Sequence, residues 1–238
     1  MVERVPRRRI ELLDLWRSVS VAVMVCWHAA YDLALFGRLD MAAFDRWPLR
    51  AVRYAVAVSF LLISGAASRF SRSAARRGFT IFCAGFAVTA ATAFVGMPVG
   101  FGILQLIGAS MLISSVQAQR LQSIRGVLMP VLCVAAHFSM LALCRSVRVG
   151  VKWLYPLGLR YPGFYSADYY PLLPWFPVFL FGIWLGGVIE RNADAPVLSR
   201  RYPPALTFAG RHSLVIYLAH QPVLYGLCAL WLKQVWND

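Results

Sequence analysis

The chain has 238 residues, of which 60% are hydrophobic, and it carries a formal net charge of +14. A soluble domain of this size is closer to half apolar and lacks long uncharged runs, so the composition argues against a soluble protein. The net positive charge alone would be compatible with binding to nucleic acid. Arginine-rich loops facing anionic lipid explain it in a membrane protein, so nucleic-acid binding is set aside.

Seven apolar segments predict membrane-spanning helices, so the expected fold is an all-α, polytopic helical bundle that forms one domain over residues 1–238. In chain order, the expected spans are residues 12–36, 50–69, 79–96, 100–117, 126–144, 172–190 and 209–232. A Gly-Met-Pro-Val-Gly turn at residues 96–100 joins the third and fourth spans into a hairpin. The basic N-terminus precedes a long apolar run without a small-residue cleavage site, which predicts a retained helix rather than a signal peptide.

The distribution of arginine and lysine predicts that the N-terminus lies on the inner side of the membrane. This orientation places fifteen of the 24 basic residues inside, as the positive-inside rule requires. They are Arg4, Arg7, Arg8, Arg9, Arg17, Arg69, Arg72, Arg76, Arg77, Arg120, Arg125, Arg191, Arg200, Arg201 and Arg211. Seven spans then put the C-terminus outside, but a re-entrant segment or a missed span would reverse its side.

The first span carries polar residues inside an apolar run, LWRSVSVAVMVCWHAAYDL at residues 15–33. At about 100° per residue, four of them share one stripe, which must face the bundle interior because lipid cannot solvate it. They are Asp14, Arg17, His28 and Asp32. Asp32, one turn beyond His28, is expected to bond one imidazole nitrogen, so that the other acts as a general base. Arg17, paired with Asp14 and about 16 Å from His28 along the axis, suits a phosphate-bearing ligand.

The last span is the second one that carries polar residues, in FAGRHSLVIYLAHQPVLYG at residues 208–226. Its expected N-terminus offers free N–H groups and a partial positive charge to a phosphate. The candidates there are Arg211, His212 and Ser213. Farther along, three polar residues share one face of the helix. They are Tyr217, His220 and Gln221. For both polar spans, a network that only ties helices together remains the alternative.

The loop at residues 145–171 is the longest on the expected outer side, and it leads into the next span through YPGFYSADYYPLLPW at residues 161–175. Its aromatic residues fit either an aromatic belt at the membrane edge or a loop shaped over a site. The candidates for a site are Asp168, Tyr169, Tyr170 and Trp175. His137 has no acidic neighbour in sequence and is expected to be structural. No standard ligand spacing is present, so no metal is expected.

Five stretches resemble the bacterial membrane proteins that carry the heparan-α-glucosaminide N-acetyltransferase catalytic-domain name, part of a wider transmembrane acyltransferase group. They are RIELLDLWRSVSVAVMVCWHAAYDL at 9–33, SFLLISGAAS at 59–68, FGILQLIGAS at 101–110, YSADYYPLLPWFPVFLFGIWLGG at 165–187 and GRHSLVIYLAHQPVL at 210–224. Arg17, ten residues, then His28 is also similar to the Arg-x10-His signature of membrane acyltransferases that O-acylate surface polysaccharides.

The resemblance implies a bacterial inner-membrane acyltransferase with an acetyl-CoA or other acyl-CoA donor on the cytoplasmic side. It also implies a hydroxyl or amine acceptor, often a sugar, on the outer side. By position, His28 becomes the catalytic base, with Asp32 beside it, and Arg17 a donor-site residue. His220 and Ser213 belong to the closing motif and Asp168 to the outer-loop motif. The first lumenal loop of the lysosomal branch holds a catalytic histidine, whereas residues 37–49 here contain none. Either His28 takes that role or the chemistry differs.

Two other classes of function remain open at this stage. Intramembrane Arg, His and Asp also suit a transporter or proton-coupled permease, and buried charges can serve a non-catalytic scaffold. Binding of acyl-CoA would distinguish the acyltransferase from the transporter and the scaffold, because only the acyltransferase needs to bind it. The expected partners are therefore membrane lipid, acyl-CoA and a sugar or other small acceptor, and a homodimer is left open.

Overall fold

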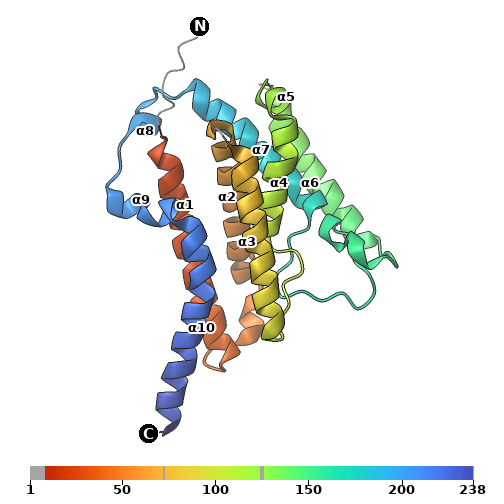
Figure 1. The fold of residues 1–238 in the computed structure, drawn as a ribbon, viewed down its shortest axis with the longest axis vertical. Coiled ribbons are helices and arrows are strands. Elements are labelled where there is room, and N and C mark those ends of the chain that lie inside the picture. Colours follow the sequence, from red (N-terminus) through yellow and green to blue (C-terminus); the bar gives the residue numbers. More distant parts are fainter. Residues whose placement is uncertain (1–8, 72, 124–125, 238) are drawn as a thin grey trace. The chain divides into compact units, whose positions relative to one another are not determined.

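The structure, a computed structural model, describes residues 9–71, 73–123 and 126–237, and within these it is built from helices and loops (Figure 1). The helices are α1 (Glu11–Leu35), η1 (Met41–Asp45), α2 (Trp47–Phe70), α3 (Ala74–Phe94), α4 (Ile103–Val116), α5 (Ala118–Ser123), α6 (Leu128–Ser146), η2 (Lys152–Leu157), α7 (Leu172–Arg191), α8 (Pro196–Ser199), α9 (Pro204–Arg211) and α10 (Ser213–Asn237). The predicted all-α class is confirmed. The basic residues at positions 1–8, Arg72 and Arg125, used above to predict the orientation, lie outside the described residues.

Six helices in the described ranges are long and apolar enough to cross a membrane. They are α1, α2, α3, α6, α7 and α10. The span expected at 100–117 is the 14-residue helix α4, about 21 Å long at 1.5 Å per residue, against a hydrocarbon core of about 30 Å. After a turn at Gln117 the chain continues as the short helix α5. The polytopic helical architecture is confirmed, and the count of seven spans is not.

The chain divides into two compact units, each described by itself. The terminal unit contains residues 9–60 and 194–237, and the central unit contains residues 61–193. Helix α2 contributes its first half to the terminal unit and its second half to the central unit. That residues 1–238 act as one domain stays a prediction.

The terminal unit is assembled around α1. Helix α9 crosses α1, and α10 runs along it (Figure 1). The crossing is close at Gly210, whose backbone N–H donates to Ser18 Oγ at 2.7 Å. Near the other end of α1, Trp27 Nε1 donates to the carbonyl of Leu49 and its ring packs edge-on against Phe44. These contacts hold η1 and the first turns of α2 against the helix that carries the polar stripe.

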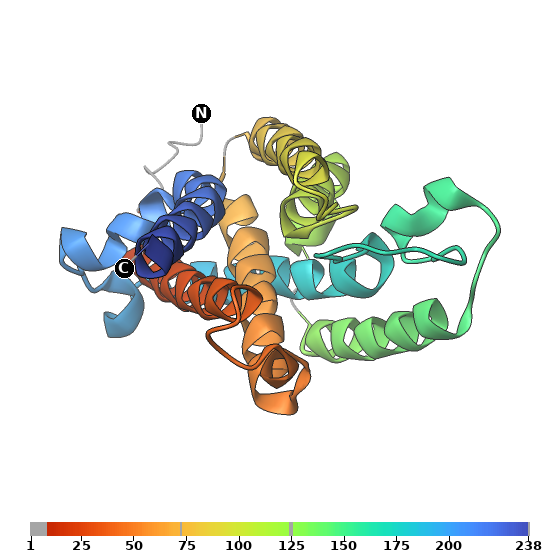
Figure 2. The same ribbon diagram turned by 90° about the horizontal axis from the view of Figure 1, so that it is seen from below.

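The central unit contains two helix pairs. The predicted hairpin turn is confirmed: α3 ends just before Gly96, whose φ of +73° favours glycine, and α4 begins at Ile103. Helices α6 and α7 lie side by side, joined by the loop at residues 147–171 (Figure 2). Gly182 of α7 packs so closely on the backbone of Leu62 that a side chain would not fit. Small residues of this kind let membrane helices approach.

Gln105 links the two helices of the hairpin and is 1% exposed. Its Nε2 donates to the Gly85 carbonyl and Thr89 Oγ1, and its Oε1 accepts from the Gly102 N–H. We expect Gln105→Met to destabilise the protein by about 1–3 kcal/mol, because a buried carbonyl and a buried N–H lose their partner. The thermal unfolding midpoint in detergent would measure this. Gln117→Met, at an exposed turn, is the matched control, and equal midpoints for the two variants would contradict the expectation.

Candidate active site

One end of the α1 stripe is an ionic cluster around Asp14, which is 4% exposed. Arg9 Nε lies 2.5 Å from one Asp14 oxygen, and Arg17 lies 3.4 Å from the other, so the predicted pairing of Asp14 with Arg17 is confirmed. Arg211 lies 3.9 Å from Asp14 and 3.8 Å from Glu11. The hydrogen bond to Asp14 raises the pKa of Arg9. Among the described residues, three guanidinium groups thus face two carboxylates, and this set, the Asp14 cluster, has a surplus positive charge that suits an anion.

A cavity of about 200 Å³ adjoins the Asp14 cluster. It is lined by Arg9, Glu11, Leu198, Ser199, Arg200 and Arg201. The backbone N–H of Tyr202 donates to Glu11 Oε2 at 2.7 Å and holds this loop against α1. Sequence reasoning missed the lining arginines as site residues, because the loop at 198–201 lies far from α1 in the chain. Their only signal was the run Ser-Arg-Arg after a short helix.

The predicted phosphate seat at the start of the last helix needs correction. Arg211 lies in the final turn of α9 rather than in the first turn of the last helix, and α10 begins at Ser213. His212, between them, is exposed and packs against Phe208 with tilted rings whose centroids are 4.4 Å apart. The signal for a separate helix was the Pro203-Pro204 pair, because proline favours the first turn of a helix. Arg211 therefore reaches the Asp14 cluster from α9.

The other end of the stripe carries two histidines in contact. The rings of His28 and His220 meet edge to face, with centroids 4.8 Å apart. His28 Nδ1 lies 2.9 Å from the Met24 carbonyl, and His220 Nδ1 lies 2.6 Å from the Tyr217 carbonyl. A carbonyl oxygen can only accept, so both Nδ1 atoms carry the proton. Both Nε2 atoms then present a lone pair in the neutral rings, which is the state a general base requires.

Asp32 does not orient His28 as the sequence predicted. Within the described chain its hydrogen bond goes to Gln221, whose Nε2 donates to Asp32 Oδ1 at 2.8 Å, and Met24 holds the imidazole instead. Asp32 is fully buried, and its Oδ2 has no hydrogen-bond partner among the described residues. The same holds for Gln221 Oε1 and His220 Nε2. These three buried atoms all accept hydrogen bonds, so the group bound here should bring donors.

The residues predicted from the loop at 145–171 lie in the central unit, where they pack against its own elements. Asp168 follows Ser166, whose hydroxyl accepts from the Gly100 N–H of the hairpin turn. Tyr169 donates from its hydroxyl to the Tyr155 carbonyl at 2.6 Å, and burial raises its pKa. Tyr170 and Trp175 are buried against each other, with ring centroids 5.2 Å apart.

His137 belongs to the same aromatic group, because its ring packs against Trp175 and its Nδ1 donates to the Pro174 carbonyl. This agrees with the structural role predicted for it. The loop is therefore docked on the α3–α4 turn, and its aromatic residues act first as packing partners.

A family model described as heparan-alpha-glucosaminide N-acetyltransferase, catalytic, matches residues 9–222. The chain belongs to this family. The match covers α1, the first ten residues of α10 as far as Pro222, and the loop that ends at Pro171. No curated protein and no solved structure matches the chain. The family and the six long apolar helices make the protein a membrane acetyltransferase.

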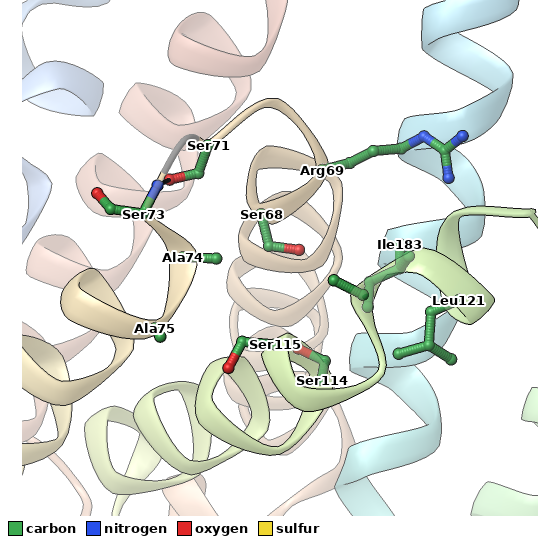
Figure 3. Close-up of a pocket in the computed structure, with 11 residues that line it drawn as sticks. Ser68, Arg69, Ser71, Ser73, Ala74, Ala75, Ser114, Ser115, Leu121 and Ile183 are labelled. Carbon is green, nitrogen blue, oxygen red and sulfur yellow. Dashed lines mark hydrogen bonds between the residues drawn. The ribbon is translucent and has the colours of Figure 1, made fainter.

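Another cavity of the acetyltransferase, about 240 Å³, lies in the central unit and is lined by none of the predicted site residues. Figure 3 shows serines around it, with the Arg69 guanidinium turned toward α7, where its Nε bonds Glu190 at 2.7 Å. The hydroxyls of Ser68, Ser114 and Ser115 donate to carbonyls of their own helices. Because these groups have partners within the unit, we assign the cavity no part in the reaction. No cluster of metal-ligating side chains occurs within the described ranges.

Proposed function

We propose that the protein transfers an acetyl or other acyl group from acyl-CoA to a hydroxyl or amine acceptor, a sugar or glycan, within the terminal unit. One observation carries this proposal. Helix α1 presents an arginine-rich anion site at one end of its polar stripe and His28 at the other end, where the His28 ring meets the ring of His220 from α10. Arg17 and His28 are about 16 Å apart along the axis, a distance that suits the pantetheine arm.

The Asp14 cluster is the proposed seat of the donor phosphates. Arg17 and Arg211 would bind them with charge-assisted hydrogen bonds, which are stronger than neutral ones. Arg9, Arg200 and Arg201, around the adjoining cavity, add further positive charge for the nucleotide end. Ser213 begins α10 nearby, and His212 precedes it. Asp14 keeps these guanidinium groups together before the donor arrives.

His28 is the proposed general base. Its Nε2 takes the proton from the acceptor O–H or N–H while the acceptor lone pair forms a bond to the thioester carbonyl carbon. The C–S bond of the tetrahedral adduct then breaks, and His28 returns the proton to the CoA sulfur. The products are the acyl ester or amide and free CoA. This direct transfer needs no acyl-enzyme, although the sequence leaves a histidyl intermediate open.

Acceptor recognition is assigned to the buried acceptor atoms beside His28. Asp32 Oδ2, Gln221 Oε1 and His220 Nε2 have no partner among the described residues, so they would receive hydrogen bonds from a group rich in O–H and N–H donors. A sugar is such a group. Tyr217, whose ring packs against His220, would border the same site. Asp168, Tyr169, Tyr170 and Trp175 remain predicted acceptor residues.

In this proposal, the distribution of basic residues determines which side of the membrane each end of the α1 stripe faces. With the N-terminus inside, the Asp14 cluster faces the cytoplasm of a bacterial inner membrane and meets acyl-CoA there, while His28 lies toward the outer side. The reaction is then a glycan modification across the membrane. A proton-coupled transporter or a scaffold would carry similar buried charges but would have no reason to bind CoA.

The donor site is tested by binding. We expect the double variant Arg17→Gln, Arg211→Gln to weaken acetyl-CoA binding about 100-fold, since each lost charge-assisted bond is worth about 1.5 kcal/mol or more. Titration calorimetry in nanodiscs would measure the dissociation constant, which should also rise with salt for the wild type. Arg76→Gln, an exposed arginine of α3, is the control. A wild type that binds no acetyl-CoA, or a double variant that binds as well as the control, would overturn the donor site.

A further inference from the structure

Arg53 is a half-buried residue with a buried Nε, and the proposed reaction has not used it. It lies in the first half of α2, within the terminal unit, and its Nε is buried without a hydrogen-bond partner in the described ranges. A guanidinium nitrogen left in this state is costly, because nothing repays the loss of its water. Ionisable residues inside membrane helices usually mark functional sites for this reason. By sequence alone, Arg53 is only one of the nine basic residues that the predicted orientation leaves on the outer side.

The packing of α2 on α1 places the turn that carries Arg53 beside the part of α1 that carries His28. Trp27 Nε1 donates to the carbonyl of Leu49, which fixes that turn of α2 against α1. Arg53 is four residues beyond Leu49 and so lies one turn farther along the same face of α2. Trp27 is the neighbour of His28, and their rings are 5.1 Å apart. Arg53 and His28 therefore lie on neighbouring turns of the two packed helices, on either side of the Trp27–Leu49 contact.

The site beside His28 is otherwise short of hydrogen-bond donors. Asp32 Oδ2, Gln221 Oε1 and His220 Nε2 all accept, and the Gln221 amide nitrogen already donates to Asp32. A thioester carbonyl that is attacked here develops a negative charge on oxygen, which needs donors aimed at it. Arg53 has only donors, five N–H groups in a planar fork. It is a positive donor beside the proposed base with a nitrogen still to be satisfied.

We propose that Arg53 donates a hydrogen bond to the thioester carbonyl oxygen of the acyl donor and stabilises the oxyanion that forms when the acceptor adds. This deepens the proposed function and rests on it. His28 Nε2 takes the acceptor proton, the acceptor lone pair forms the new bond, and the carbonyl π electrons move to the oxygen held by Arg53. When the C–S bond breaks, the oxygen regains its double bond, and His28 protonates the sulfur. Arg53 keeps its own protons throughout.

The competing explanation is that Arg53 only packs. Its guanidinium carbon lies 5.5 Å from the ring centroid of Tyr54, and a cation–π contact of this kind stabilises a fold without touching substrate. The two roles differ in what they require. A packing role tolerates lysine, which keeps the charge over the ring, and it does not respond to an added small cation. An oxyanion role needs the planar donor fork beside His28.

The experiment compares Arg53→Gln, Arg53→Lys and Arg53→Ala with wild type, in nanodiscs, by the release of free CoA from acetyl-CoA with mixed amino sugars and lipid-linked sugars. We expect Arg53→Gln to lower kcat by about 10²–10³, as removal of an oxyanion donor does elsewhere, with little change in KM for acetyl-CoA. Arg53→Lys should recover only a small part of the loss. Added guanidinium should partly restore Arg53→Ala. The exposed Arg50→Gln, one turn earlier on α2, is the matched control and should retain wild-type turnover.

The outcomes separate the inference from the function on which it rests. Wild-type turnover together with full turnover in Arg53→Gln overturns the role of Arg53 and leaves the acyltransferase intact. Loss in Arg53→Gln accompanied by a lower thermal unfolding midpoint, with full rescue by lysine and none by guanidinium, also overturns it in favour of packing. A wild type that releases no CoA and binds none overturns both proposals. Loss of kcat at unchanged midpoint and unchanged acetyl-CoA affinity, with guanidinium rescue, supports it.

Discussion

His28→Gln is expected to lower kcat for acetyl transfer by about 10²–10⁴, the range that general-base catalysis supplies. Glutamine fills a similar volume but has no atom at the Nε2 position that can take a proton at neutral pH. The hydrogen bond between His28 Nδ1 and the Met24 carbonyl supports this expectation, because it leaves Nε2 as the ring nitrogen that can accept a proton. Release of free CoA under saturating acetyl-CoA and acceptor would measure kcat, and His28→Ala should show a similar loss.

Controls for this prediction come from other histidines. His137→Gln changes a histidine of the central unit whose Nδ1 donates to the Pro174 carbonyl, and it should retain most of its turnover. The acetyl-CoA dissociation constant of His28→Gln should match the wild type, since the proposed phosphate site at Arg17 lies about 16 Å away. If both His28 variants keep turnover within tenfold of wild type, His28 is not the base, and His220, whose Nε2 is also free, becomes the next residue to test.

The relative positions of the polar residues on α1 could be predicted from the sequence, because the geometry of a helix depends only on the spacing of residues along the chain. A spacing of eleven residues on one helix determines both the face and the separation of Arg17 and His28. The contact of Asp14 with Arg17 follows from a spacing of three, and it is present. The hairpin turn at Gly96 is equally local, since only glycine adopts its positive φ readily.

The contacts that define the chemistry could not be read from the sequence, because they depend on residues far apart in the chain. Asp32 is bonded by Gln221, and Asp14 is approached by Arg211, both from the last two helices. A one-turn spacing allowed Asp32 to reach His28, but every helix also offers a carbonyl four residues earlier, and His28 bonds that of Met24. Local spacing gives no means of choosing between these two acceptors.

Arg53 and the helix α9 illustrate the same limit. Arg53 was one of many basic residues until the contact of Trp27 with Leu49 showed which face of α2 meets α1. The last expected span began at residue 209, because the apolar pattern runs on through His212. The chain instead completes α9 and starts again at Ser213, so Arg211 ends one helix and does not begin the next. A boundary between two apolar helices leaves little trace in hydropathy.

Gly210→Ala is expected to destabilise the protein by about 1–3 kcal/mol or more and to weaken acetyl-CoA binding at the same time. A Cβ at this position would overlap the Asp14 carbonyl oxygen and come within 3.0 Å of Ser18 Oγ. The obstacle is backbone, which cannot rotate away, so α9 must move off α1. The Gly210 N–H would then lose its bond to Ser18, and Arg211, the next residue, would withdraw from Asp14.

The terminal unit supplies its own control, Gly226 of α10, where an added Cβ meets nothing within 4 Å. Gly226→Ala should be neutral or slightly stabilising, because alanine favours a helix over glycine. The thermal unfolding midpoint in detergent and the acetyl-CoA dissociation constant, measured on both variants, test the argument. A lower midpoint with unchanged affinity would separate the α1–α9 crossing from the donor site. Unchanged values for Gly210→Ala in both measurements would mean that α9 does not hold Arg211 against α1.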